Sequence, residues 1–145
     1  SWKNFDFSAY FQGIAGNDIY KFYRRPNATL ANFGTEWLDR WHGAGTSNKM
    51  PRLVEGDNIN DQISDFFVED GSYFRFKVAQ IGYTLPERIS RKVGMKALRL
   101  FLQGENLFTI TGYTGYDPEV GTRDGLDAGT YPQARTFTAG VNIKF

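Results

Sequence analysis

The clearest pattern in the chain is a strict alternation of apolar and polar positions near its C-terminal end. From residue 135 to residue 145, every second position is apolar: Phe137, Ala139, Val141, Ile143 and Phe145. A repeat of two is typical of a β-strand whose two faces meet different surroundings. A tilted strand needs about 9 to 11 residues to cross a membrane, so the length fits a membrane strand. A half-buried strand of a soluble β-sandwich fits the same pattern equally well.

Two further segments, 2–13 and 97–108, show the same two-faced pattern. One face of each is apolar: Phe5, Phe7, Ala9 and Phe11 in the first, and Leu98, Leu100 and Leu102 in the second. The opposite faces carry Asn4, Asp6, Ser8, Tyr10 and Gln12, and Arg99, Phe101, Gln103 and Glu105. The apolar faces are free of charge and the other faces are strongly polar. This contrast favours lipid on one side and a water-filled lumen on the other.

A fourth strand, expected over 71–85, changes parity along its length. Its apolar residues move from even to odd positions: Phe74 and Phe76, then Ile81, Tyr83 and Leu85. A shift of one residue would turn half of the strand to the wrong face. One extra residue in a β-bulge corrects such a shift. We therefore predict a bulge between Lys77 and Gln80, with Arg75 and Lys77 pointing into the lumen.

The connections between these strands are unequal in length. A short basic link covers 86–96, whereas 14–70 and 109–134 are long. Compact soluble domains rarely contain structureless loops longer than about 15 residues, but outer-membrane barrels combine short turns at one rim with long loops at the other. We expect the two long loops to be extracellular, and the link and Phe145 to lie at the periplasmic rim.

Composition narrows the class of protein further. The hydrophobic fraction of 41% and the mean hydropathy of −0.46 would by themselves suggest a soluble protein. No apolar run approaches the 18 or so residues of a transmembrane helix, but averaged hydropathy hides alternating barrel strands. The absence of cysteine excludes a disulfide scaffold. A net charge of +1 gives no field that favours nucleic acid.

The predicted sheet is too small to close on itself. Four strands fall short of the roughly eight that a membrane barrel requires, and an open sheet with an apolar face would aggregate through its edges. We therefore expect the chain to be one part of a larger barrel.

Several motifs, taken in order and spacing, resemble a known family. They are Gly16-Asn17-Asp18-Ile19-Tyr20, Glu69-Asp70-Gly71-Ser72-Tyr73-Phe74-Arg75-Phe76-Lys77, Ile81-Gly82-Tyr83-Thr84-Leu85-Pro86, Gly104-Glu105-Asn106-Leu107-Phe108, Tyr113-Thr114-Gly115-Tyr116-Asp117-Pro118-Glu119-Val120 and Gly129-Thr130-Tyr131-Pro132-Gln133-Ala134-Arg135-Thr136. Together they resemble the C-terminal end of SusC-like TonB-dependent transporters of the Bacteroidetes outer membrane, over nearly the whole chain.

The resemblance implies an all-β fold: about the last four strands of a 22-stranded antiparallel transmembrane barrel with an N-terminal plug. It implies uptake of oligosaccharides or peptides, powered through TonB, beneath a SusD-like surface lipoprotein. The plug and the TonB box would lie outside this sequence. The last strand also resembles the signal recognised by the barrel-assembly machinery, carried here by Phe137, Val141, Ile143 and Phe145.

No catalytic constellation is present in the sequence. There is a single histidine, His42, and no zinc-type pair, phosphate loop or serine nucleophile motif. The stretch 56–61 is similar to a calcium loop, but Ile59 stands where an oxygen ligand is needed. We therefore expect no enzyme, no metal and no cofactor.

The loops are better candidates for binding. Aromatic rings stack on sugars, and carboxylates and arginine bond to hydroxyl groups. The candidates for contact with substrate or lid are Trp37, Trp41, Tyr113, Tyr116, Asp117, Glu119, Arg123, Asp124 and Tyr131. The alternative, which we favour for most of them, is that the rings pack the loops together or against a partner. Asp117-Pro118-Glu119 has the composition of a structural turn.

Two other classes of protein remain open at this point. One is a soluble carbohydrate-binding β-sandwich with long loops, and the other is an outer-membrane enzyme or adhesin barrel. A soluble domain would enclose its Phe and Leu rows in a core of its own, so the position of these rows separates it from a membrane barrel.

Overall fold

The computed structural model describes residues 3–22, 33–53, 62–119 and 124–145. Its main element is a four-stranded sheet in which every neighbouring pair is antiparallel, in the order β1-β4-β5-β7. The strands are β1 (Phe5–Ile14), β4 (Tyr73–Thr84), β5 (Ala97–Thr111) and β7 (Thr136–Lys144). They overlap the four intervals expected from the alternating pattern, and β5 continues beyond the expected end at residue 108.

A second, small sheet was not anticipated from the sequence. Its central strand is β2 (Asp18–Lys21), which pairs antiparallel with β3 (Val68–Asp70) and parallel with β6 (Leu126–Asp127). Because β2 and β3 belong to the 14–70 loop and β6 to the 109–134 loop, this sheet joins the two long loops.

The helical segments are short. They are η2 (Thr35–Asp39), η4 (Asp65–Phe67), α1 (Glu87–Ser90) and η5 (Arg91–Val93). In η2, Trp37 is buried whereas Leu38 is 73% exposed, so this turn packs through one ring. Among the described residues, no helix has the length and apolar character needed to cross a membrane.

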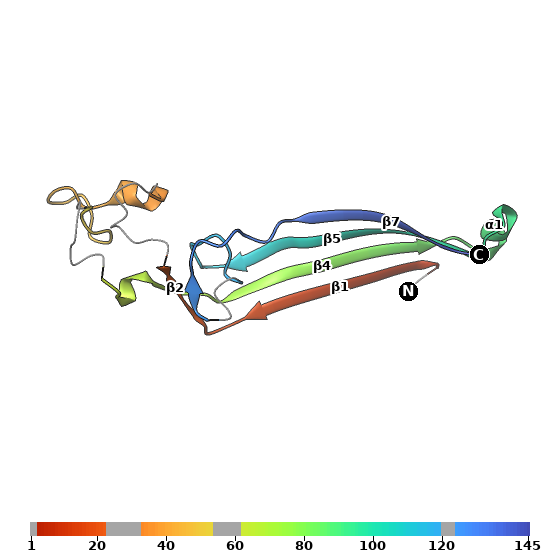
Figure 1. The fold of residues 1–145 in the computed structure, drawn as a ribbon, viewed down its shortest axis with the longest axis horizontal. Helices are drawn as coiled ribbons and strands as arrows, with labels where there is room; N and C mark the ends of the chain where they lie inside the picture. Colours follow the sequence, from red (N-terminus) through yellow and green to blue (C-terminus); the bar gives the residue numbers. More distant parts are fainter. Residues whose placement is uncertain (1–2, 23–32, 54–61, 120–123) are drawn as a thin grey trace.

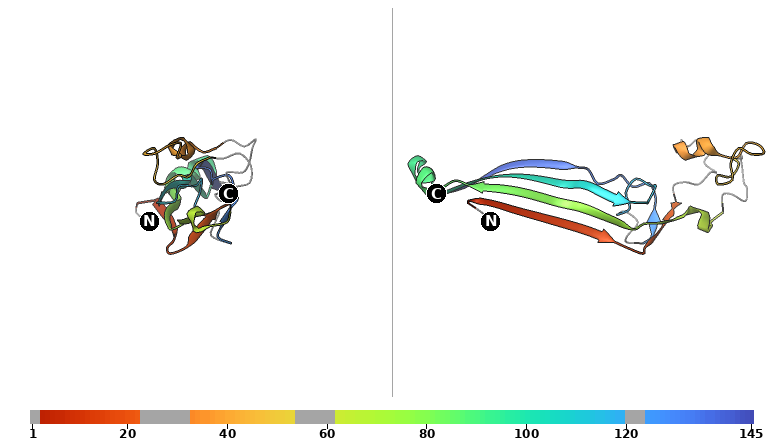
Figure 2. Two further views of the ribbon diagram at one scale, coloured as in Figure 1. Left: turned by 90° about the vertical axis from the view of Figure 1, so that its left-hand side faces the viewer. Right: turned by 180° about the vertical axis from the view of Figure 1, so that it is seen from behind.

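The strands of the main sheet run side by side along the long axis of the molecule (Figure 1). The small sheet and the 33–53 segment lie at one end, and α1 and both chain termini lie at the other. The view from behind shows the same separation (Figure 2). The two long loops and the short link therefore lie at opposite ends of the strands.

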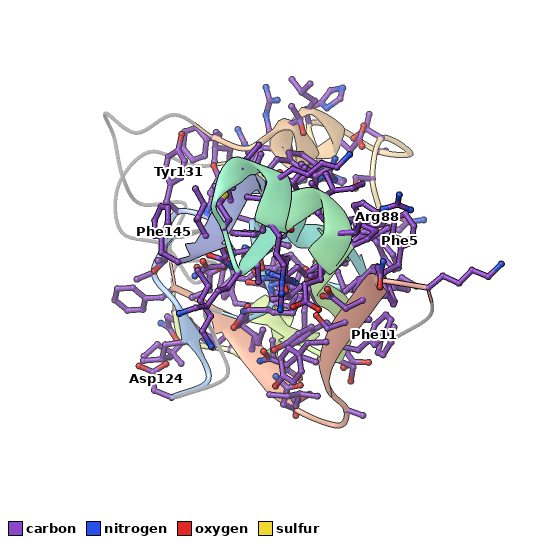
Figure 3. All side chains as sticks on the ribbon, turned by 90° about the vertical axis from the view of Figure 1, so that its right-hand side faces the viewer. Phe5, Phe11, Arg88, Asp124, Tyr131 and Phe145 are labelled. Carbon is purple, nitrogen blue, oxygen red and sulfur yellow. The ribbon has the colours of Figure 1, made fainter. Side chains whose placement is uncertain are left out.

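The pairing register places the apolar residues of the four strands in continuous rows. One row runs Phe7, Ile81, Leu102 and Ala139, and the next runs Phe5, Tyr83, Leu100 and Val141. Seen along the strands, Phe5, Phe11 and Phe145 lie at the periphery (Figure 3). We call the surface formed by these rows the apolar face.

The apolar face is exposed rather than enclosed. Phe7 is 68%, Leu102 60% and Phe137 73% exposed. The buried apolar side chains of the described residues lie outside these rows: Ile19, Trp37, Phe67, Tyr73 and Tyr113. The described part of the sheet has no closed core of its own, which argues against the soluble sandwich.

The β-bulge lies at Lys77, the first residue of the interval in which it was predicted. Between β1 and β4 the pairing passes from Val78 to Phe76 and skips Lys77. Between β4 and β5 the same residue is skipped, where Asn106 takes a left-handed conformation with φ of 51°. The extra residue brings Phe76 onto the same face as Ile81, as the parity argument required.

The opposite surface of the sheet, the polar wall, carries hydrogen-bonded side chains. Arg99 of β5 reaches across β4 to Asp6 of β1, with Nη2 2.5 Å from Oδ1. Gly82 lies between them, and a Cβ there would be 2.4 Å from Nη2 of Arg99 and 2.5 Å from Oδ2 of Asp6. The glycine therefore leaves the space through which this ion pair forms.

Gly140 offers a test of close packing on the polar wall. It pairs with Phe101, whose ring would lie 2.3 Å from a Cβ at position 140. We expect Gly140→Val to lower the free energy of unfolding of the full-length protein by about 1–3 kcal/mol, because overpacked sites displace their neighbours. Urea unfolding in detergent micelles measures the change. In a Phe101→Ala background the same substitution should cost little, and an equal cost in both backgrounds would contradict the packing argument.

Candidate functional site

The candidate site is the polar wall near the loop-bearing end of the sheet, together with the loops that fold onto it. The wall contributes Gln12 from β1 and Tyr73 and Arg75 from β4, and Lys77 projects from the bulge. The segment between β5 and β7 turns back over this wall and brings two carboxylates, those of Asp117 and Glu119.

Arg75 is the centre of this contact. It is only 4% exposed, and all three of its guanidinium nitrogens donate hydrogen bonds. Nη2 donates to Oδ1 of Asp117 at 2.5 Å, Nη1 to Oε2 of Glu119 at 2.6 Å, and Nε to Oγ1 of Thr109 at 2.7 Å. The planar group is thus fixed by β5 on one side and by the loop on the other.

Glu119 joins the loop to a second cation. Nζ of Lys77 lies 2.6 Å from Oε1 and 2.7 Å from Oε2 of Glu119. Gln12 donates to the hydroxyl of Tyr73 at 2.9 Å and stands 3.5 Å from Oε1 of Glu119. Bulges commonly redirect a side chain, and here the bulged residue carries the charge that meets the loop.

Asp117 is the most enclosed member of the group, at 2% exposure. Its carboxylate also accepts the backbone N–H groups of Glu119 at 3.0 Å and of Gln133 at 2.9 Å. Burial alone would raise the pKa of Asp117, but the bonds from Arg75 and from these two N–H groups outweigh it and hold the pKa below its ordinary value. The ionised carboxylate therefore fastens both limbs of the loop to the wall.

A second polar cluster, the loop junction, lies beside the small sheet. It consists of Lys21, Glu69, Tyr113, Thr114 and Asp127. Lys21 is 2% exposed, is ion-paired with Glu69, bonds to Thr114 and lies 5.1 Å from the centre of the Tyr113 ring. The Tyr113 hydroxyl donates to Oδ2 of Asp127 at 2.7 Å. Each of the three strands of the small sheet supplies one of these charged groups, so the junction fixes the two loops to each other.

The residues proposed from sequence for substrate or lid contact fall into two groups. Trp37, Tyr113 and Asp117 are buried, and Glu119 is ion-paired on the wall. The solvent-exposed members are Trp41, Tyr116, Asp124 and Tyr131, with Tyr131 at 91% exposure. Arg123 lies outside the described residues, as does the 56–61 stretch.

A cleft lies beside Trp41, between the 33–53 and 62–67 segments. Its lining includes Trp41, Ser47, Lys49, Arg52 and Phe66. Of these five residues only Trp41 was predicted from the sequence, because Ser47, Lys49 and Arg52 form no recognisable motif and Phe66 comes from a more distant part of the chain. It also identified Arg75 and Lys77 as lumen residues, but gave no sign that their partners would be Asp117 and Glu119.

The four residues predicted to form the assembly signal lie on the apolar face of β7 or at its end. Phe137, Val141, Ile143 and Phe145 are between 48% and 76% exposed. No group of three or more metal-ligating side chains occurs in the described ranges. Within those ranges the arrangement provides charge pairing, loop anchoring and exposed rings.

Asp117→Asn should loosen the loop in the full-length protein. The substitution removes the charge from a buried pair but keeps its shape, and hydrogen bonds to charged groups contribute about 1.5–3 kcal/mol. We expect the backbone N–H groups of Gln133 and Glu119 to exchange with solvent roughly 10 to 100 times faster. Hydrogen exchange measured by mass spectrometry reports this change. Glu87→Gln is the control, because its ion pair with Arg91 is exposed on both sides.

The anchoring of the loop to the wall should also weaken at acid pH. The pKa of Asp117 lies below its ordinary 3.8, and that of Glu69 below 4.5 because hydrogen bonds from Lys21 and Thr114 outweigh the opposing effect of burial. A lowered carboxylate pKa stabilises the docked loop above the ordinary value and loses that effect as pH falls through the shifted value. A spin label at Tyr131→Cys should therefore keep its mobility from neutral pH to about 4 and gain mobility below it. Release between pH 7 and 5 would contradict this assignment.

Comparison with known proteins places the chain in a family. No protein-family model matches it. It is 36% identical to TonB-dependent receptor P3 of Formosa agariphila, an alignment that covers 99% of this chain and 15% of that receptor. It is 28% identical to TonB-dependent receptor SusC of Bacteroides thetaiotaomicron, over 99% of this chain and 14% of SusC. The chain thus spans about one-seventh of the length of these relatives.

Solved structures agree with these relatives. The RagAB peptide transporter matches with a TM-score of 0.79 at 25% identity, over 100% of this chain and 16% of that chain. The RagAB peptide importer in its closed-closed state matches with a TM-score of 0.79 at 26% identity, over the same shares. These relatives are receptors and importers rather than enzymes. The chain is therefore a segment of a TonB-dependent receptor of the SusC type.

Proposed function

We propose that this segment forms the last four strands of a 22-stranded outer-membrane barrel that imports oligosaccharides or peptides. The observation that carries the proposal is the contrast between the two surfaces of the main sheet. One is a continuous exposed apolar face, and the other is a charged wall whose loop-bearing end is covered by the chain's own loop. Hydrocarbon outside and a wet lumen inside account for both surfaces.

The edges of the sheet also support a larger barrel. Within the described residues, β1 and β7 each pair on one side only in the main sheet. A membrane strand must satisfy its backbone groups by pairing, since hydrocarbon offers no partner. We infer that strands outside this sequence pair with both edges and close the barrel.

The proposed orientation follows from the two ends of the sheet. The long loops gather at one end, which we assign to the cell exterior, and α1 with both termini at the other, which we assign to the periplasm (Figure 1). Long outer loops and short inner turns are typical of such barrels. Barrel-assembly machinery would then recognise the outward side of β7 from the periplasm.

Energy and partners are inferred from the family resemblance. Uptake would be driven by TonB through a plug that lies outside this sequence, and a SusD-like surface lipoprotein would close over the loops. The similarity to SusC and to the RagAB structures supports this arrangement. RagAB is a peptide importer, which makes peptides one substrate class to test beside oligosaccharides.

We assign different roles to the two groups of loop residues. The solvent-exposed Trp41, Tyr116, Asp124 and Tyr131 are candidates for substrate or lid contact, with Arg123 added from the sequence alone. The buried Trp37 and Tyr113, and the ion-paired Asp117 and Glu119, keep the loops in shape. Aromatic side chains with one exposed side suit either a sugar or a protein lid.

A pair of arginine substitutions tests the lipid assignment in the full-length receptor. Leu102→Arg places a charge on the apolar face near the middle of β5, and Thr138→Arg places one on the polar wall of the adjacent strand. An arginine facing the bilayer midplane costs about 2–4 kcal/mol. We expect Leu102→Arg to reduce the amount of folded barrel in the outer membrane, measured by heat-modifiable migration in gels, and Thr138→Arg to leave it nearly unchanged.

The import assignment is tested by the uptake of substrate, measured on the wild type and on the same two variants. Uptake per folded receptor, measured with labelled oligosaccharides and peptides in cells with and without TonB, should depend on TonB for the wild type. Equal folding of both variants would contradict the lipid assignment. Uptake that does not depend on TonB would contradict the importer assignment.

A further inference from the structure

We propose that the link between β4 and β5, residues 86–96, is a binding surface for the headgroups of anionic phospholipids. We call it the basic link. The inference rests on the proposed function, because it requires the apolar face to meet a bilayer. It adds a lipid partner at the end of the strands opposite to the long loops.

The basic link concentrates positive charge in a chain that is otherwise nearly neutral. It contains Arg88, Arg91, Lys92 and Lys96 and a single acid, Glu87, whereas the whole chain has a net charge of +1. Glu87 is ion-paired with Arg91. Arg88, Lys92 and Lys96 are exposed and have no side-chain ion pair within the described part of the chain. Three cations thus remain available to an outside partner.

Exposed apolar residues accompany these cations. Ile89 is 50% and Val93 61% exposed, and they are four residues apart, as are Arg88 and Lys92. Two apolar and two basic side chains are therefore exposed on the same two short turns, α1 and η5. Ser90, between them, is fully buried and marks the side that packs against the protein.

Backbone hydrogen bonds give the link a defined shape. The carbonyl of Pro86 accepts bonds from the N–H groups of Ile89 at 2.8 Å and Ser90 at 3.2 Å, and the N–H of Met95 donates to Ser90 at 3.0 Å. Gly94 ends the turn with a φ of 75°. The four exposed side chains are therefore presented by an ordered double turn.

The position of the link matches the headgroup layer. It follows Leu85, whose N–H donates to the carbonyl of Leu98 at 2.8 Å and closes the β4–β5 hairpin. The last apolar row that spans all four strands contains Phe5, Tyr83 and Leu100, and the pair Leu98 and Ile143 continues the apolar face up to the link. Seen along the strands, Arg88 lies on the same side as Phe5 (Figure 3). The cations therefore come directly after the end of the surface that we assign to hydrocarbon.

This combination is suited to an anionic interface. Apolar side chains enter the boundary of the acyl chains while lysine and arginine extend their charged ends to the headgroups. Guanidinium groups bind phosphate oxygens with two parallel hydrogen bonds. Each basic residue close to an anionic membrane surface raises the affinity about fivefold.

The test compares lipid binding by matched charge-removal variants of the full-length receptor. Purified receptor in detergent is titrated with phosphatidylglycerol or phosphatidylcholine, and bound lipid is counted by native mass spectrometry. Arg88→Gln with Lys92→Gln should weaken phosphatidylglycerol binding at least tenfold and leave phosphatidylcholine binding unchanged. Lys49→Gln with Arg52→Gln removes the same charge from the loop end and should change neither. A third variant, Ile89→Ser with Val93→Ser, should weaken the binding of both lipids.

Each outcome is decisive for the basic link. Unchanged phosphatidylglycerol binding in the Arg88→Gln and Lys92→Gln variant overturns the proposal, as does an equal loss in the loop-end control. Tighter binding of lipopolysaccharide than of phosphatidylglycerol at the link also overturns it, because that result places the link in the outer leaflet. TonB-dependent uptake is measured on the variant that combines Arg88→Gln with Lys92→Gln. Intact uptake with altered lipid binding separates this inference from the importer assignment, which fails only if uptake itself does not require TonB.

Discussion

The bulge at Lys77 is the constraint on which the rest of the structure depends. Side chains alternate along a strand, so a single residue decides which face each later side chain takes. With Lys77 skipped, Phe76 and Ile81 lie on one face and join the apolar residues of the two neighbouring strands, β1 and β5. The same extra residue gives the opposite face a lysine next to Arg75, at the place where the loop carboxylates arrive.

The ion pairs on the polar wall show how a loop can be held without a hydrophobic core. Burying Arg75 and Asp117 costs desolvation energy, which good geometry and additional hydrogen bonds must offset. Here Arg75 makes three directed bonds and Asp117 accepts two backbone N–H groups besides. Such a contact is highly directional, so it specifies the path of the loop over the wall more sharply than apolar packing would.

The long strands were predictable because each contains an uninterrupted repeat of two, and the bulge was predictable because the repeat changes parity within one of them. β2, β3 and β6 contain four, three and two residues, and such short segments show no periodicity. Asp117 and Tyr131 were both candidates for substrate or lid contact, although Asp117 also belonged to an expected structural turn; Asp117 is buried and Tyr131 is 91% exposed. Residue type gives the chemistry of a side chain, but the long-range path of the loop decides whether solvent reaches it.

The small sheet has a mechanical consequence. Because β2 pairs with β3 on one side and with β6 on the other, the two long loops share a hydrogen-bonded ladder, and Lys21 and Asp127 lie in register across one of its seams. Displacing one loop alone would shear this ladder and expose buried charges, at a cost of several kcal/mol for an unpaired buried ion. A movement of both loops together would leave the hydrogen bonds of the ladder intact. A force applied to one loop is therefore transmitted to the other, and the two loops move as one rigid unit.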